Sequence, residues 1–154
     1  MTADSPAIAA LLPHGPPMRL LDEVLEYDGT SVTVAATIRA DHPFFDAGAS
    51  GIPCHVGIEL MAQACGTFAG LRAAGTGHPP ALGFLLGTRH FQAAVRWFGV
   101  GQRLVVSATV AYLDGEMGVF DCRISVGLTE RASAQLTVYQ PVDAAAVLAG
   151  GVGS

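Results

Sequence analysis

Residues 52–74 carry the feature that most restricts the fold. The pattern predicts one long helix, in which Pro53 suits the first turn and Gly75 the end. The predicted helix is apolar or small on nearly every side, and a helix without a polar face is buried on most sides. In a chain of 154 residues, only a sheet wrapped around the helix can bury it in this way.

The segments on both sides of this helix have strand character. Residues 18–27 and 31–39 are predicted to pair as a hairpin, because Asp28 and Gly29 between them are typical of a tight turn. After a Gly- and Pro-rich break at 75–80, the predicted strands lie at residues 82–95, 103–113, 117–126 and 132–139. This order of elements predicts the α+β class.

One domain accounts for the chain. Residues 1–141 are predicted to form it, with a short helix at 5–12 that Ser5 caps. Residues 142–154 are rich in Ala and Gly and are predicted to form a flexible C-terminal tail. Only 14% of the residues are charged, so part of the apolar surface of so short a chain is expected to be covered by a second copy.

Charge and cysteine content narrow the class of function. With a net charge of −5 and no lysine, the chain is not expected to bind nucleic acid. No apolar stretch reaches the roughly 18 residues of a membrane span, and the N-terminus lacks the basic region of a signal peptide. Three cysteines without a CxxC spacing indicate reduced thiols. We therefore expect a cytoplasmic protein with no membrane partner.

Glu59 is the strongest candidate for chemistry. It is the only acidic residue between Asp46 and Asp114, and it lies near the start of the predicted buried helix. A carboxyl group in apolar surroundings suits proton transfer near neutral pH; the alternative is a carboxylate that bonds first-turn amides. Gln63 lies four residues on, so it shares a helix face with Glu59 and can orient the carboxylate, unless a strand or a partner helix packs there.

Two histidines are candidate partners for Glu59. His14 is held in a stiff segment of prolines and glycine at 13–17, and its alternative role is to bond loop carbonyls. His55 lies four residues before Glu59, within reach across one turn, and its alternative is a solvent-facing position at the helix start. A catalytic pair must flank the reacting atoms, which a residue from another segment does more readily, so His14 is favoured.

The remaining polar groups around the helix start give weaker signals. Cys54, His55 and Glu59 could hold a metal ion, but a further well-spaced ligand is missing, so no metal site is predicted. The cysteines are interpreted as small apolar residues, and the histidines at 42, 78 and 90 are expected at the surface. The backbone N–H of Gly57 could stabilise a carbonyl oxygen that becomes negative during a reaction.

Several stretches resemble motifs of the 3-hydroxyacyl-[acyl-carrier-protein] dehydratases. The resemblance covers residues 8–141, and the similar stretches are LLPHGPPM at 11–18, LLDEV at 20–24, FF at 44–45, ELMAQA at 59–64 and FGVGQRL at 98–104. Within that family, the chain is most similar to the dehydratase-like proteins of aryl-polyene gene clusters. Their shortened helix start is matched by PCHVGIE at 53–59.

The resemblance implies a fold, an assembly and a reaction. The fold is the hot-dog fold, a bent antiparallel sheet wrapped around one long central helix, and the assembly is a homodimer with acyl tunnels at its interface. The reaction is the elimination of water from a 3-hydroxyacyl chain carried as a thioester on an acyl carrier protein or on coenzyme A. No cofactor is implied beyond the phosphopantetheine arm. The implied catalytic residues are Glu59 with His14 or His55, and the implied substrate contacts are Gln63, Gly57, Val56 and Phe45.

One departure from the family keeps three functions open. The dehydratases place a catalytic histidine in a loop before the helix, and the corresponding residues 46–51 read DAGASG, without a histidine. The first function is the dehydratase itself, with another histidine as substitute. The second is an acyl thioesterase in which Glu59 activates water. The third is an inactive hot-dog subunit that supports another chain or binds acyl groups.

Overall fold

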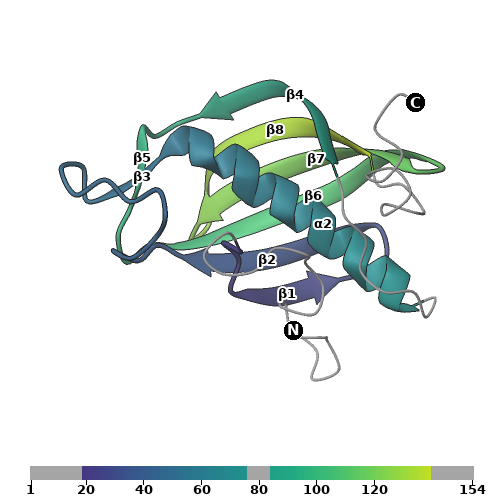
Figure 1. The fold of residues 1–154 in the computed structure, drawn as a ribbon, viewed down its shortest axis with the longest axis horizontal. Coiled ribbons are helices and arrows are strands. Elements are labelled where there is room, and N and C mark those ends of the chain that lie inside the picture. Colours follow the sequence, from purple (N-terminus) through teal and green to yellow (C-terminus); the bar gives the residue numbers. More distant parts are fainter. Residues whose placement is uncertain (1–18, 76–83, 140–154) are drawn as a thin grey trace, which may run out of the picture.

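The computed structural model describes residues 19–75 and 84–139, and it shows one long helix lying against a curved antiparallel sheet (Figure 1). The elements, in chain order, are β1 (Glu23–Tyr27), β2 (Ser31–Thr37), β3 (Gly51–Pro53), the 3₁₀ turn η1 (Cys54–Val56), α2 (Gly57–Gly75), β4 (Phe84–Ala93), β5 (Trp97–Gly99), β6 (Arg103–Asp114), β7 (Met117–Val126) and β8 (Thr129–Tyr139). The larger sheet has the order β1-β2-β6-β7-β8-β4, and β3 pairs with β5. The predicted α+β class and hot-dog architecture are confirmed.

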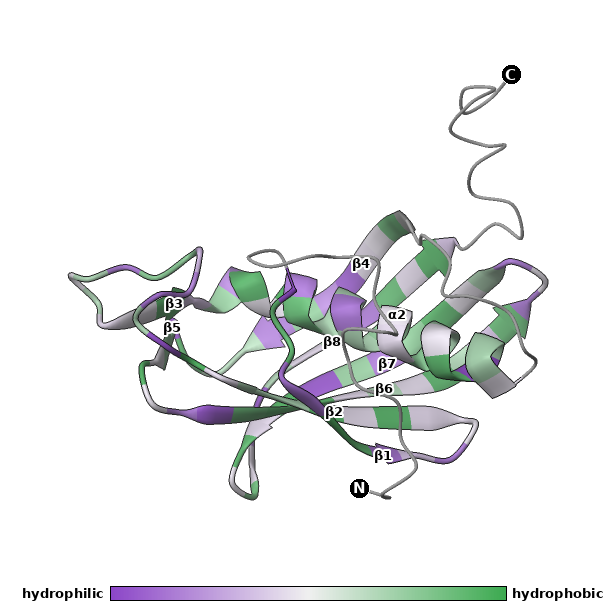
Figure 2. Cartoon of the chain, turned by 60° about the horizontal axis from the view of Figure 1, so that its bottom comes forward, coloured by the Kyte–Doolittle hydropathy of each residue, from purple (hydrophilic) through white to green (hydrophobic). Residues whose placement is uncertain are grey.

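The core lies between α2 and one face of the larger sheet. Alternate residues of β6 and β7 point into it, and opposite partners such as Val106 with Ile124 and Ala108 with Cys122 are all buried. Figure 2 shows hydrophobic residues along both the helix and the strands beneath it. This core forms for two reasons. Apolar residues alternate with a period of two in the strands, and the helix is apolar on nearly all of its surface.

The predicted turns and strands agree with the structure in their main features. Gly29 and Gly115 have positive φ values of 87° and 58°, as the turns after Asp28 and Asp114 require. The first strand begins at Glu23, five residues later than predicted. The predicted helix at 5–12 and tail at 142–154 lie outside the described residues. Among the residues that the structure describes, no helix is long and apolar enough to cross a membrane.

The start of the helix differs from the prediction. Pro53 is extended, with φ −61° and ψ 144°, and it pairs with Trp97 instead of opening the helix. The helix therefore begins at Gly57, after the 3₁₀ turn. The small sheet of β3 and β5 was not predicted, because each strand has only three residues and owes its existence to the other. This sheet fixes the direction from which the chain enters α2.

Gly51→Ala tests the small sheet. A Cβ atom at Gly51 would lie 2.3 Å from the carbonyl oxygen of Phe98, which is rigid backbone, so the two strands would have to separate. We expect the free energy of unfolding to fall by about 1–3 kcal/mol, the usual scale of overpacking, in urea titration. Gly87→Ala is the matched control, because nothing lies within 4 Å of a Cβ there. An equal effect of the two substitutions would contradict the predicted close contact.

Candidate active site

Glu59 lies in the first turn of α2 and is half-buried. The N-terminal end of a helix favours negative charge, so the fold itself supports a carboxylate at this position. The residues that follow Glu59, Leu60 and Met61, are fully buried and pack the helix against the sheet. Glu59 is therefore a polar group on the rim of a mostly apolar helix, which holds it on a rigid element.

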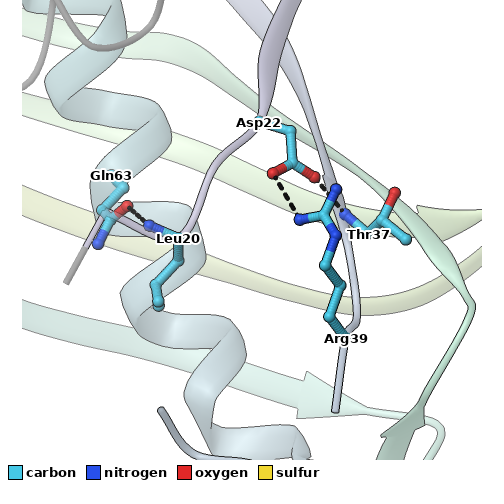
Figure 3. A network of polar contacts seen from close by, with 5 residues as sticks. All are labelled: Leu20, Asp22, Thr37, Arg39 and Gln63. Atoms are coloured by element: carbon cyan, nitrogen blue, oxygen red, sulfur yellow. Dashed lines mark hydrogen bonds and ion pairs between the residues drawn. The ribbon is translucent and has the colours of Figure 1, made fainter. Parts of the chain in front are cut away.

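Gln63 connects Glu59 to the interior. Its side chain is only 1% exposed, and its amide nitrogen donates to Oε1 of Glu59 at 3.1 Å. Its amide oxygen accepts the backbone N–H of Leu20 at 2.8 Å (Figure 3). The predicted approach of Gln63 to Glu59 along one helix face is present. A buried amide that is satisfied at both ends has little freedom to turn, so it can hold the carboxylate in one orientation.

Of the two histidines predicted as partners of Glu59, the structure describes only His55. His14 lies outside the described residues. His55 lies in η1, one turn before Glu59, and it is exposed. This position agrees with the solvent-facing alternative for His55. The assignment of the catalytic histidine to His14 or His55 stays a prediction.

His42 is more enclosed than the sequence indicated. It lies in the loop between β2 and β3, where its Nδ1 accepts the backbone N–H of Phe44 at 3.1 Å. Its Nε2 is buried and has no hydrogen-bond partner among the described residues. Burial lowers the pKa of His42, and the carboxylates of Asp41 and Asp22 partly oppose this shift. The neutral imidazole is thus part of the loop that precedes the helix. No local sequence pattern predicted that His42 would be enclosed there.

The lowered pKa of His42 predicts a pH dependence of stability. In the unfolded chain the imidazole has its ordinary pKa of about 6.5, so below this pH the unfolded state binds a proton that the folded state does not yet bind. Stability is therefore expected to fall as the pH drops from about 7 to about 5. In His42→Gln, this fall should be smaller, as measured by urea titration at several pH values. The exposed His90 provides the control His90→Gln; equal slopes in both variants would contradict the prediction.

The other predicted substrate contacts have mainly structural positions in the single chain. A Cβ atom at Gly57 would lie 2.9 Å from Cδ1 of Ile124, so this glycine lets the helix start approach the sheet. The backbone N–H at the Gly57 cap is directed to the carbonyls of Cys54 and His55 in the preceding turn. Its role at a thioester oxygen stays a prediction. Val56 is buried in the core and Phe45 is half-buried; their contact with substrate stays a prediction.

Cysteine and metal chemistry contribute little to this site. Cys65 and Cys122 are buried, with their sulfur atoms 3.8 Å apart, and burial raises the pKa of the Cys65 thiol. They behave as the small apolar residues that were predicted. Among the described residues, no three His, Cys, Asp or Glu side chains are grouped so that they could hold a metal ion.

Comparisons with known proteins agree with this architecture. A solved chain of the dehydratase heterocomplex ApeI:P from Xenorhabdus doucetiae matches with a TM-score of 0.88 and 28% identity, covering 94% of this chain and 97% of that chain. A hypothetical thioesterase from Streptococcus pneumoniae TIGR4, solved with coenzyme A, matches with a TM-score of 0.60 and 12% identity, over 77% of this chain and 84% of that chain. The second likeness concerns the fold alone.

Sequence comparison points to the same group of proteins. The 3-hydroxyacyl-[acyl-carrier-protein] dehydratase FabZ of Chlamydia caviae is 31% identical over 134 residues, which are 82% of this chain and 84% of the relative. The FabZ of Streptococcus thermophilus LMD-9 is 36% identical over 69 residues, so the match spans 43% of this chain and about half, 49%, of that relative. The model of the ApeP-like family, described as ApeP dehydratase, matches residues 6–149. With its hot-dog fold and a match over nearly its whole length, this chain belongs to the ApeP-like dehydratase family.

Proposed function

We propose that this protein eliminates water from 3-hydroxyacyl thioesters carried on the phosphopantetheine arm of an acyl carrier protein. Membership of a dehydratase family supports the reaction class. The observation that carries the proposal is the contact between Glu59 and Gln63, because it places an oriented carboxylate at the start of the central helix. We propose that the reaction needs no cofactor beyond the pantetheine arm of the substrate. We also propose that the protein acts in the cytoplasm.

The reaction requires two proton transfers on neighbouring carbons. A base removes the proton at C2, which the thioester carbonyl makes acidic, and the electron pair forms the C2–C3 double bond. The C3–O bond breaks as an acid protonates the leaving hydroxyl, which departs as water. Glu59 performs one of these transfers, and a histidine, His14 or His55, performs the other. Gln63 keeps the Glu59 carboxylate in position during both steps.

Mass spectrometry of the carrier tests this function. The protein is incubated with a 3-hydroxyacyl-carrier protein, and in a parallel arm with the coenzyme A thioester. Loss of one water from the acyl chain is the expected result. Loss of the whole acyl group would identify a thioesterase instead. An unchanged acyl mass in both arms would contradict an autonomous dehydratase.

A second function is favoured by the loop before the helix. Residues 46–51 contain no histidine, and the similar Xenorhabdus doucetiae chain comes from a dehydratase heterocomplex. In this alternative, the chain is one subunit of a composite dehydratase and supplies Glu59 to a site that another hot-dog subunit completes. Water loss only after addition of the second subunit would distinguish this function from the first.

We expect association with another chain in both functions, and β4 offers a surface for it. This strand is at the edge of the larger sheet, and its Leu85 and Leu86 are 43% and 58% exposed. An apolar sheet edge is suited to pairing with a second chain. Sedimentation should show a dimer at micromolar concentration, and Leu86→Arg should shift it toward the monomer. Leu128→Arg, in an exposed turn, is the control. A monomeric wild-type chain would contradict homodimer formation.

A further inference from the structure

A short segment before the first strand links the sheet to the candidate site. Residues 19–22, here named the strap, run between α2 and the end of β2 (Figure 3). The side chains of Leu20 and Leu21 are buried in the core, so the strap is held by packing along its middle. Nothing in the reaction scheme above uses it directly.

One end of the strap is bonded to the sheet through Asp22. Its backbone N–H donates to the carbonyl of Ala35 at 2.8 Å. Its carboxylate accepts the backbone N–H of Thr37 at 2.7 Å and the guanidinium of Arg39 at 3.2 Å. Both carboxylate oxygens take part (Figure 3). These bonds fix the strap against β2 only two residues away from Leu20.

The backbone N–H of Leu20, within the strap, limits how the Gln63 amide can lie. Because the Leu20 N–H is a donor, only the oxygen of the amide can face it. The nitrogen then faces Glu59. The reversed amide would oppose a donor to a donor at Leu20 and an acceptor to an acceptor at Glu59, so the buried Leu20 N–H and the half-buried carboxylate would each lose this partner. The direction of the Leu20 N–H therefore favours the amide orientation in which the nitrogen of Gln63 faces the Glu59 carboxylate.

We infer that the backbone N–H of Leu20 is a positioning group for Glu59, acting through the Gln63 side chain. The effect on catalysis rests on the proposed function. The positioning itself rests on the two hydrogen bonds that join Leu20, Gln63 and Glu59. Leu20 and Gln63 are 43 positions apart in the sequence. Through the strap, a segment near the start of the domain therefore helps to position Glu59. Leu20 itself does not touch the reacting atoms in this scheme.

A pair of substitutions at Leu20 isolates the N–H group. Leu20→Ala removes most of the side chain and keeps the backbone N–H, whereas Leu20→Pro removes both. The chain has five Gln and no Asn, so the Gln63 side-chain NH₂ is readily resolved by NMR. We expect its exchange with solvent to remain slow in Leu20→Ala and to become about 10-fold faster or more in Leu20→Pro. In the dehydration assay, kcat should be about 10-fold lower in Leu20→Pro than in Leu20→Ala, with KM changed less than about threefold.

The two readouts separate the inference from the proposed function. A wild-type protein that performs no dehydration contradicts the function, while the exchange of the Gln63 NH₂ still decides whether the strap holds the amide. Equal exchange rates, or equal kcat values, in the two variants would overturn the inference. If Leu20→Pro does not fold, exchange of the Leu20 N–H in the wild type decides the matter. Slow exchange is expected, and exchange at the rate of an exposed amide would overturn it.

Discussion

Glu59→Gln is expected to lower the turnover of a 3-hydroxyacyl thioester by about 100-fold or more, the usual scale for loss of a general acid or base. The substitution keeps the size and shape of the side chain, and an amide at position 59 can still accept a hydrogen bond from Gln63. It removes the carboxyl group that we propose exchanges protons with the substrate. The measurement is the rate of water loss from the acyl chain, followed by the mass of the carrier, with the second hot-dog subunit added if the wild type requires it.

The matched control for this prediction is Glu26→Gln. Glu26 is an exposed carboxylate of β1, so it undergoes the same change of charge away from the site. Fold and association are compared by circular dichroism and sedimentation, and both variants should retain them. Unchanged turnover in Glu59→Gln would show that another group carries the proton. Unfolding of Glu59→Gln would assign the carboxylate a structural role instead.

Phe98→Ala should reduce the free energy of unfolding by about 3–5 kcal/mol, because it leaves a cavity in a fully packed region. Phe98 has no solvent exposure, its backbone pairs with Ile52 across the small sheet, and its ring lies beside Gly57. The substitution therefore loosens the start of the helix that carries Glu59. Urea titration gives the stability, and a loss of turnover larger than the loss of folded protein would show that the helix start has moved.

Phe44→Ala is the control for Phe98→Ala. Phe44 is 42% exposed, so its removal costs less packing and should lower stability by about 1 kcal/mol or less. Both substitutions remove the same ring, so the difference between their losses of stability measures the effect of burial. Equal losses in the two variants would contradict the position of Phe98 as the anchor between the small sheet and α2.

Local pattern alone accounts for the parts of the fold that are long and regular. The continuous apolar surface of α2 required a sheet around it, and the alternation in β6 and β7 identified the strands that provide it. The spacing of four residues between Glu59 and Gln63 was enough to bring them together, because a helix places such pairs on one face.

The supports of the site were decided by contacts between distant segments. Each three-residue strand of the small sheet exists only through its partner, so Pro53 was misassigned to the helix. The burial of His42 depends on how its loop folds back, not on its neighbours in the sequence. The Leu20 N–H meets Gln63 across 43 positions. The sequence by itself determined the candidate carboxylate, Glu59, and the helix that carries it, because these depend on local periodicity. Only the tertiary structure decided what holds them, because hydrogen bonds and packing between remote segments leave no periodic signal.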